Sequence, residues 1–250
     1  MNSVRSTALS SMPVRSTNSD STTADRAVLM CASALFAGLD REELLHIASC
    51  ARARSFARDE LLFMQGQPVQ GLMLLQTGSV KQTQLSSSGE EVILWMHGQG
   101  DAVGMNPGEQ PCNHTCSARA LENCKALVWE YSRLQTLLSG HPQIRTNINR
   151  ILSSRLQELE ERFREVATEK VAKRLAFTLL RLLKQVGKEH QAGTELSLSR
   201  EELAQKTGTT LFTISRILSR WAEEGFILPR REAVVIKDPA RLLQIGDKED

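Results

Sequence analysis

The sequence predicts an α+β fold in which an N-terminal antiparallel jelly roll is joined by one long helix to a C-terminal winged helix-turn-helix. Short apolar runs separated by glycines fill residues 52–132, and an apolar stripe without glycine or proline runs through residues 144–166. Two short helical patterns flank Gly208. The expected division is a disordered tail over 1–25, a jelly-roll domain over 26–140, a long helix over 141–167 and a C-terminal domain over 168–245.

The composition limits the classes of function. Of the 250 residues, 41% are hydrophobic and 24% are charged, which is ordinary for a soluble protein. The formal net charge is only +2, so binding to nucleic acid would require a local basic face. The five cysteines show no disulfide spacing, which favours a reducing compartment. Because no nucleophile elbow, phosphate loop or pair of carboxylates is found, we do not expect an enzyme.

The N-terminal region combines a polar tail with an apolar segment. The tail over 1–25 is rich in serine and threonine. The segment "AVLMCASALFAGL" over 27–39 has the composition of a signal-peptide core, but "DREELLHIA" continues it at helical spacing and no small-residue cleavage site follows. We therefore expect one amphipathic first helix with Cys31 and Cys50 in the core. Since no stretch is long enough to span a membrane, a cytoplasmic location is expected.

The glycine-punctuated region predicts a jelly roll because its apolar runs are five to eight residues long and end at turns that need positive φ. The segment "GLMLLQTGSVKQTQL" alternates around an expected turn at Thr77-Gly78, and "SSSGEEVILWM" alternates after an expected turn at Ser88-Gly89. The segment "SARALENCKALVWEY" over 117–131 is expected to be the closing hairpin of the sheet.

A long helix is expected to begin at His141-Pro142. Its apolar stripe recurs at steps of three or four residues through Ile144, Ile148, Leu152, Leu156, Leu159, Phe163 and Val166. A helix of this length with an apolar seam and charged flanks favours packing against a second copy of itself. The candidate dimer contacts are Ile148, Leu152, Leu156, Leu159 and Phe163. The alternative is that the stripe packs only on its own sheet.

The segment 198–238 predicts two helices joined by a tight turn. Ser199 and Glu202 form a capping-box pattern, and Gly208 suits the left-handed position of the turn. Thr209 or Thr210 is expected to cap the second helix. After Gly225, "FILPRREAVVIKD" indicates a hairpin wing.

The second of these helices is expected to face DNA. Hydroxyls and arginines recur on one side of it, and these groups suit phosphate oxygens and guanine edges respectively. The predicted DNA contacts are Arg200, Thr209, Thr210, Phe212, Thr213, Ser215, Arg216, Arg220 and Arg230. Arg231 is a further cation of the wing. The alternative is a helical hairpin used for protein contacts.

Cysteine and histidine alternate in the loop "PCNHTC", where Cys112, His114 and Cys116 are two residues apart. Thiolate and imidazole groups are ligands for zinc, iron or an iron–sulfur cluster. A fourth ligand could come from Cys124, His97 or a partner chain. Three interpretations stay open: a metal, cluster or haem ligand; a dithiol switch through Cys112 and Cys116; or a surface loop without a sensing role, beside a small buried Cys124.

The segments "LFAGLDREELLHIA", "MQGQPVQGLMLLQTGSVKQTQLSSSGEEVILWMHGQGDAVG" and "SREELAQKTGTTLFTISRILSRWAEEGFI" stand in this order along the chain. Over roughly residues 33–245 this arrangement resembles the Crp/Fnr (cyclic-AMP receptor protein / fumarate-nitrate regulator) superfamily of bacterial transcription regulators. The resemblance implies a homodimer that senses an effector in the jelly roll and binds a pseudo-palindromic operator. It also implies RNA polymerase as a partner.

Departures from the family pattern bear on the effector and on base readout. His114-Thr115 falls where cyclic-AMP members have an Arg-Ser pair, and a neutral imidazole is a poor substitute for a guanidinium on phosphate. We therefore expect a redox, nitric oxide, haem or metal signal, with haem, an iron–sulfur cluster or a bound metal as candidate cofactors and cAMP not expected. Phe212 takes the place of a glutamate found in many members, while Arg216 matches the family's guanine-reading arginine. Alternatives are a cyclic-nucleotide regulator with a degenerate phosphate cassette, or an adaptor that does not bind DNA.

Overall fold

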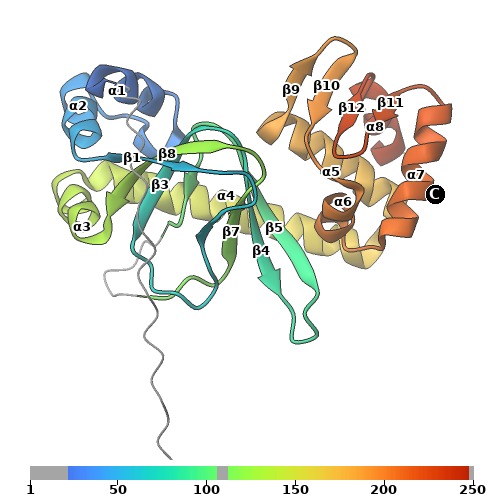
Figure 1. The fold of residues 1–250 in the computed structure, drawn as a ribbon, viewed down its shortest axis with the longest axis horizontal. Helices are drawn as coiled ribbons and strands as arrows, with labels where there is room; N and C mark the ends of the chain where they lie inside the picture. The colour runs from blue at the N-terminus through green and yellow to red at the C-terminus, as the bar shows by residue number, and fades with distance from the viewer. Residues whose placement is uncertain (1–21, 106–111, 248–250) are drawn as a thin grey trace, which may run out of the picture.

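The computed structural model describes residues 22–105 and 112–247 and has the predicted order of a jelly roll, a long helix and a winged helix-turn-helix (Figure 1). The N-terminal helices gather at one end of the jelly roll, and the C-terminal domain lies at the other end. The predicted tail lies mostly outside the described residues. Its last residues are helical, because α1 (Thr23–Cys31) begins with a capping box between Thr22 and Asp25.

The prediction of one amphipathic first helix through the segments 27–39 and 40–48 is wrong. The segment forms α1, the 3₁₀ turn η1 (Ala34–Phe36) and α2 (Arg41–Ser49). The break follows from local chemistry, since Gly38 has φ 85° and Asp40 starts a new capping box with Glu43. Cys31 is exposed at the end of α1 and does not lie in the core as predicted. Cys50 is half-buried and packs against the core formed by the N-terminal helices.

Two antiparallel sheets face each other across an apolar core in the jelly roll. One sheet has the order β1-β8-β3-β6 and the other β2-β7-β4-β5. The strands are β1 (Arg52–Phe56), β2 (Leu61–Phe63), β3 (Gly71–Thr77), β4 (Val80–Leu85), β5 (Glu91–His97), β6 (Ala102–Val103), β7 (Ser117–Ala120) and β8 (Cys124–Glu130). Buried side chains from both sheets form this core, as alternation along each strand requires.

The turn expected at Ser88-Gly89 joins paired strands, because β4 pairs with β5 on either side of it. The turn expected at Thr77-Gly78 connects β3 to β4, and these two strands lie in different sheets. The closing hairpin expected over 117–131 is wrong, since β7 pairs with β2 and β4 while β8 pairs with β1 and β3. Ala118, Ala120, Cys124 and Ala126 are all buried in one core, so the two strands face each other across it. The chain also changes sheets at Gly78, which has φ 85° and whose added Cβ would lie 2.5 Å from Cys124 Sγ.

Two helices follow the jelly roll. Helix α3 (Tyr131–Gly140) ends at His141, and α4 (Pro142–Thr168) begins with a proline at its first position. The first turns of α4 belong to the chain's own core, where Ile144 and Ile148 pack with residues of α1, α2 and α3. Ile148 is only 1% exposed, so it is not available to a partner helix as expected.

Asn147 fastens α4 to this core. It is fully buried, and its Nδ2 donates to the carbonyl oxygens of Leu35 at 3.0 Å and Ala37 at 2.8 Å. Its Oδ1 accepts hydrogen bonds from Gln143 and Arg150. The side chain therefore pairs otherwise unsatisfied backbone groups of η1 with the long helix.

The C-terminal domain combines four helices with a four-stranded sheet of order β11-β12-β10-β9. Its elements are α5 (Val171–Val186), β9 (Lys188–His190), β10 (Gly193–Leu196), α6 (Arg200–Thr207), α7 (Leu211–Glu223), β11 (Ile227–Pro229), β12 (Val234–Ile236) and α8 (Pro239–Asp247). The predicted wing is the β11–β12 hairpin. Strands β9 and β10, which pair with each other, form the other half of the sheet.

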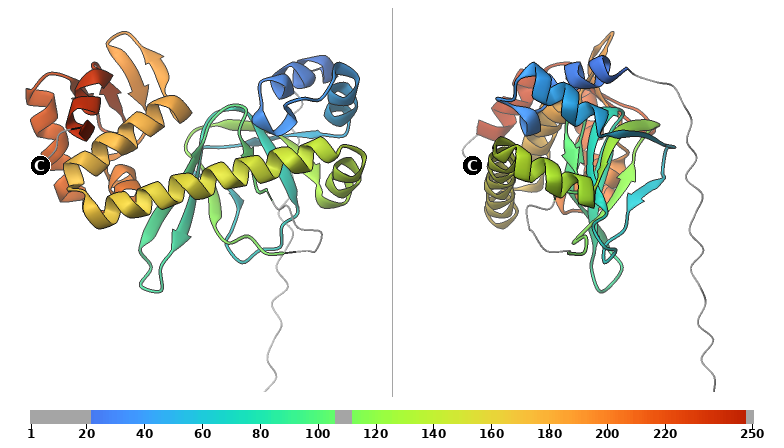
Figure 2. Two further views of the ribbon diagram at one scale, coloured as in Figure 1. Left: turned by 180° about the vertical axis from the view of Figure 1, so that it is seen from behind. Right: turned by 90° about the vertical axis from the view of Figure 1, so that its left-hand side faces the viewer.

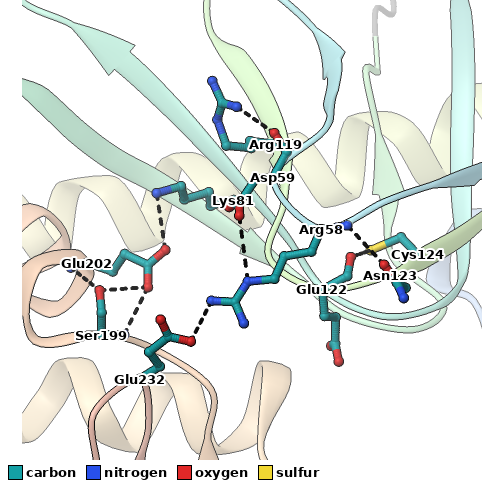
Figure 3. A network of polar contacts seen from close by, with 10 residues as sticks. All are labelled: Arg58, Asp59, Lys81, Arg119, Glu122, Asn123, Cys124, Ser199, Glu202 and Glu232. Carbon is teal, nitrogen blue, oxygen red and sulfur yellow. Dashed lines mark hydrogen bonds and ion pairs between the residues drawn. The ribbon is translucent and has the colours of Figure 1, made fainter.

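The two domains share both apolar and polar contacts. Ile93, Met96 and Leu121 of the jelly roll belong to the core of the C-terminal domain. Around them, Lys81 pairs with Glu202 at 3.2 Å and Arg58 with Glu232 at 2.8 Å, as Figure 3 shows. Apolar packing and ion pairs therefore both hold the C-terminal domain, including α6, against the jelly roll.

Among the described residues, no helix combines the length and the apolar character that a membrane span requires.

We predict that Asn147→Leu lowers the free energy of unfolding by about 1–3 kcal/mol, because two buried carbonyl groups lose their hydrogen bonds. Urea unfolding followed by tryptophan fluorescence measures this loss, since Trp129 lies in the same core. Asn149→Leu on the exposed side of α4 is the control and should change stability by less than about 0.5 kcal/mol. Equal stability of the Asn147 variant and the wild type would contradict the anchoring role.

Candidate DNA-binding surface and sensor loop

The turn between α6 and α7 has the predicted chemistry. Ser199 Oγ accepts from the Glu202 N–H at 3.2 Å, and the Glu202 carboxylate accepts from the Ser199 N–H at 2.9 Å. Gly208 lies in the left-handed region with φ 68° and ψ 51°. Of the two threonines considered, Thr210 caps α7, since its Oγ1 accepts from the Thr213 N–H at 3.2 Å. These bonds set the angle at which α7 leaves the turn.

Helix α7 has one buried face and one free face. Ile214, Leu218 and Trp221 are buried in the domain core. At 100° per residue, Phe212 and Arg216 point away from this core, and both are exposed. Figure 1 places α7 at the outer edge of the C-terminal domain, where its free face can approach another molecule.

The predicted DNA contacts divide by exposure. Arg200, Thr209, Thr213 and Ser215 are half-buried, whereas Thr210, Phe212, Arg216, Arg220 and Arg230 are exposed. Arg220 pairs with Glu224 at 3.1 Å, and Arg230 pairs with Glu195 at 3.1 Å. Arg216 makes no ion pair within the described part of the chain, so its guanidinium keeps all its donors for an outside acceptor.

A groove of about 350 Å³ flanks the C-terminal end of α7. It lies between α5, α7 and α8, and its cationic residues are Lys170, Lys173, Arg220 and Arg241. Among the described residues that line it, Glu224 is the one acidic residue, and it lies 3.9 Å from Arg241. We call this the cationic groove. Sequence reasoning found only Arg220, because Lys170 and Lys173 stand at the start of α5 and Arg241 stands on α8, and only the fold brings these residues to α7.

The second half of α4 has an apolar outer face. Leu156, Phe163 and Val166 are 57%, 76% and 54% exposed, and we call these three residues the outer face of α4. Leu152 and Leu159 are half-buried beside them. Figure 2 (left) shows α4 crossing the molecule with neither sheet covering this side. Exposed large apolar side chains in a row indicate a surface that is covered by another molecule.

The inner side of the same stretch is polar. Arg155 donates to the Ala102 carbonyl at 3.0 Å, and Arg162 donates to the carbonyls of Ile93 and Leu94 on β5. Arg162 also reaches the Lys206 carbonyl of α6 at 3.3 Å. Burial lowers the pKa of both guanidinium groups, but each keeps carbonyl partners. The apolar stripe therefore does not pack on the chain's own sheet along this half of α4.

Lys206 of α6 makes a further contact with β5. Its Nζ donates to the Leu94 carbonyl at 2.7 Å and lies 5.8 Å from the centre of the Trp95 ring. Burial, with the nearby Arg162 charge, lowers the pKa of Lys206 to about 7. The surroundings of Lys206 therefore disfavour its protonated form, although its hydrogen bond to Leu94 is made.

The loop that carries Cys112, His114 and Cys116 is held by its backbone. His114 exchanges hydrogen bonds with the segment after β2, donating to the Gln67 carbonyl at 2.8 Å and accepting from the Gly66 N–H at 2.8 Å. Its ring stacks on Phe63 with centroids 3.7 Å apart, and burial lowers its pKa. The imidazole is therefore a neutral packing group. Residues 106–111, which precede the loop, lie outside the described residues.

The thiols differ in their surroundings. Cys112 is exposed, while Cys116 is half-buried and burial raises the pKa of its thiol. Cys124 is buried, donates to the carbonyls of Ser79 and Glu122, and has a pKa raised by burial. Over residues 22–105 and 112–247, no three His, Cys, Asp or Glu side chains are grouped as metal ligands. The structure does not bring the predicted ligands Cys112, His114 and Cys116 together in such a group.

Two protein families match the chain in the predicted order. The family described as cyclic nucleotide-binding domain matches residues 53–141, and the Crp-like helix-turn-helix domain matches residues 173–245. The first range covers the jelly roll with α3, and the second covers α5 through α8. Between the two ranges lies most of α4.

Known proteins with both parts are similar over most of the chain. "Transcriptional activator protein Anr" of Pseudomonas protegens is 28% identical over 197 residues, which cover 78% of this chain and 80% of that protein. "Cyclic AMP receptor protein" of Thermus thermophilus is 29% identical over 221 residues, which cover 87% and 98%. The structure of FixK2 from Bradyrhizobium japonicum matches with a TM-score of 0.70 at 22% identity, over 80% of this chain and 99% of that one. With both domains matched in order on one fold, the chain belongs to the Crp/Fnr superfamily of DNA-binding transcription regulators.

Proposed function

We propose that this regulator is a homodimer whose two α7 helices enter successive major grooves of a pseudo-palindromic operator. The observation that carries this proposal is the free face of α7, where Arg216 points outward and makes no ion pair within the described chain. Arginine bonds the O6 and N7 atoms of guanine with two parallel hydrogen bonds, the commonest specific contact in the major groove. Thr210 at the helix start offers a hydroxyl for the phosphate backbone.

The cationic groove supports a second part of the proposal. Its four cations lie beside α7 and outnumber the two carboxylates paired with them, which are Glu224 and Glu169, the latter 3.1 Å from Lys173. Helix α5 begins at this groove with no side-chain cap, so its first N–H groups also favour an anion. A DNA strand that leaves the major groove at the C-terminal end of α7 would place phosphates here. The groove would then contribute affinity without sequence preference.

Dimerisation is supported by the two-sided character of α4. Its inner arginines bond to the chain's own backbone, while its outer face is apolar and exposed. Two copies of this face packed along parallel helices would cover Leu156, Phe163 and Val166. Such a seam fixes the distance between the two α7 helices and hence the half-site spacing.

We propose further that the effector is not a cyclic nucleotide. The described residues do not fit a cyclic phosphate: His114 stands at the expected phosphate position, is stacked on Phe63, and burial lowers its pKa. Arg155 faces the jelly roll, but its guanidinium already bonds to Ala102. The proposed signal is redox, nitric oxide, haem or metal, with the loop of Cys112 and Cys116 as the candidate sensor. It would act by shifting β5 and α4 relative to α6.

The protein acts on DNA, so the proposed function places it in the cytoplasm. The name of the Pseudomonas relative, a transcriptional activator, supports the proposal that the bound dimer acts with RNA polymerase.

We expect Arg216→Ala to weaken binding to the specific operator by a factor on the order of 10 to 100, because a bidentate guanine contact is lost. Operators are obtained by selection from random DNA, and binding is measured by electrophoretic shift. Arg133→Ala on exposed α3 is the control and should bind as the wild type does. Retained operator preference in the Arg216 variant would contradict the assignment of α7.

Phe163→Glu should dissociate the dimer, raising its dissociation constant by at least about 100-fold, because an unpaired carboxylate cannot be buried in an apolar seam. Light scattering would then give the mass of one chain, 27.8 kDa, in place of twice that mass. Gln157→Glu adds the same charge away from the outer face and should leave the dimer intact. A dimeric Phe163 variant would show that another surface joins the chains.

Removing charges from the cationic groove should reduce the salt dependence of DNA binding. For Lys173→Gln or Arg241→Gln we expect the slope of log K against log salt to fall by about 0.9 per lost phosphate contact, or about 1.8 for a dimer. The ratio of affinities for operator and random DNA should stay unchanged. Arg133→Gln is the matched control. If the slope stays the same in both variants, the groove does not contact phosphates.

A further inference from the structure

Phe212 is the most exposed large apolar side chain among the described residues, at 77%. It stands in the first turn of α7, on the side opposite Ile214 and Leu218. The aromatic residues of this domain that pack together, Trp221 and Phe226, are buried in the core behind the helix. The fold therefore gives Phe212 no apolar cover of its own.

The position of Phe212 limits what can cover it. Phe212 and Arg216 are four residues apart and lie on the same face of α7. Four residues of helix rise about 6 Å, which is close to two base-pair steps of about 3.4 Å. A helix that places Arg216 on a guanine edge therefore places Phe212 against the floor of the same groove, one or two base pairs away. The group that covers the Phe212 ring in the complex must therefore be an apolar group on the floor of the major groove.

The major groove offers one apolar group, the 5-methyl group of thymine. We propose that Phe212 reads a thymine in each half-site through this methyl group, one or two base pairs from the guanine bound by Arg216. The inference rests on the proposed DNA-binding function. It adds the chemical nature of a second recognised base, with the phenyl ring and the methyl group removing each other from water.

Neighbouring side chains do not offer the same contact. The Thr213 hydroxyl is paired with Thr210 at 3.0 Å, and Thr213 is half-buried at the edge of the free face. Leu211 is 50% exposed but is turned by about 100° from Phe212 around the helix axis, toward the buried side. Leu211 is therefore a matched control, since it is apolar, exposed and adjacent but off the proposed contact.

The test uses the full chain and an operator selected from random DNA. Each thymine of the operator is replaced in turn by deoxyuridine, which lacks only the 5-methyl group and keeps every hydrogen-bonding atom. We expect one thymine per half-site to respond, with a loss of about fourfold for one half-site and about 15-fold for both, the value for one buried methyl group. The responding thymine should lie within two base pairs of the guanine that Arg216 protects.

Two variants assign the response to a side chain. Phe212→Ala should bind the thymine operator more weakly and should no longer distinguish it from the deoxyuridine operator. Leu211→Ala should keep the full difference. Because both side chains are exposed, both variants should fold, and circular dichroism checks this.

The inference is overturned if deoxyuridine at every thymine near the guanine leaves wild-type binding unchanged, or if Phe212→Ala keeps the deoxyuridine effect. Both results leave the proposed function standing, because the operator is still bound. Failure of the proposed function differs from these results: selection then enriches no operator, or Arg216→Ala binds the selected DNA as well as the wild type does. In that case the inference falls together with the function.

Discussion

The guanidinium of Arg162 is the interaction on which the arrangement of the two domains depends. It projects from the second half of α4 and donates to carbonyl groups of β5 in the jelly roll and of α6 in the C-terminal domain. A half-buried cation is stable only when its donors are paired, so α4, β5 and α6 must keep their mutual positions for these bonds to form. Lys206 donates to the same Leu94 carbonyl, and burial together with the Arg162 charge lowers the pKa of Lys206.

This junction explains why α4 presents its apolar side outward. The half-buried Arg155 and Arg162 and the buried Glu165 occupy the inner side of the second half of the helix. Arg181 pairs with Glu165 at 2.7 Å. The leucines and Phe163 cannot turn inward without removing those bonds. In the first half the assignment is reversed, because Ile144 and Ile148 fill the core under α2 and α3. The first half of α4 therefore packs in the chain's own core, and its second half presents an exposed apolar face.

The sensor loop is constrained by packing more than by ligand chemistry. The stacking of His114 on Phe63 and the backbone bonds to the segment after β2 account for its position without a metal. Cys112 remains the exposed thiol of this loop, while Cys116 packs against the jelly-roll core. Two interior polar groups near α4 are paired: His97 shares a hydrogen bond of 2.7 Å with Gln82, and Arg155 donates to the Ala102 carbonyl. An effector that acts on this region would have to break or rearrange those hydrogen bonds.

The amino-acid sequence alone determined what local chemistry decides. The capping box at Ser199, the left-handed Gly208, the hairpin at Gly89 and the glycine-free stripe of α4 depend on neighbouring residues, and these features follow from spacing. Arg216 and Phe212 could be predicted to share the free face of α7 because helical period needs no tertiary information. Tertiary structure decided the rest. Strands β7 and β8 lie in opposite sheets, Ile148 is buried, and Lys173 and Arg241 line the same cationic groove. Each of these features depends on which segment, distant in the sequence, packs beside the residue in question.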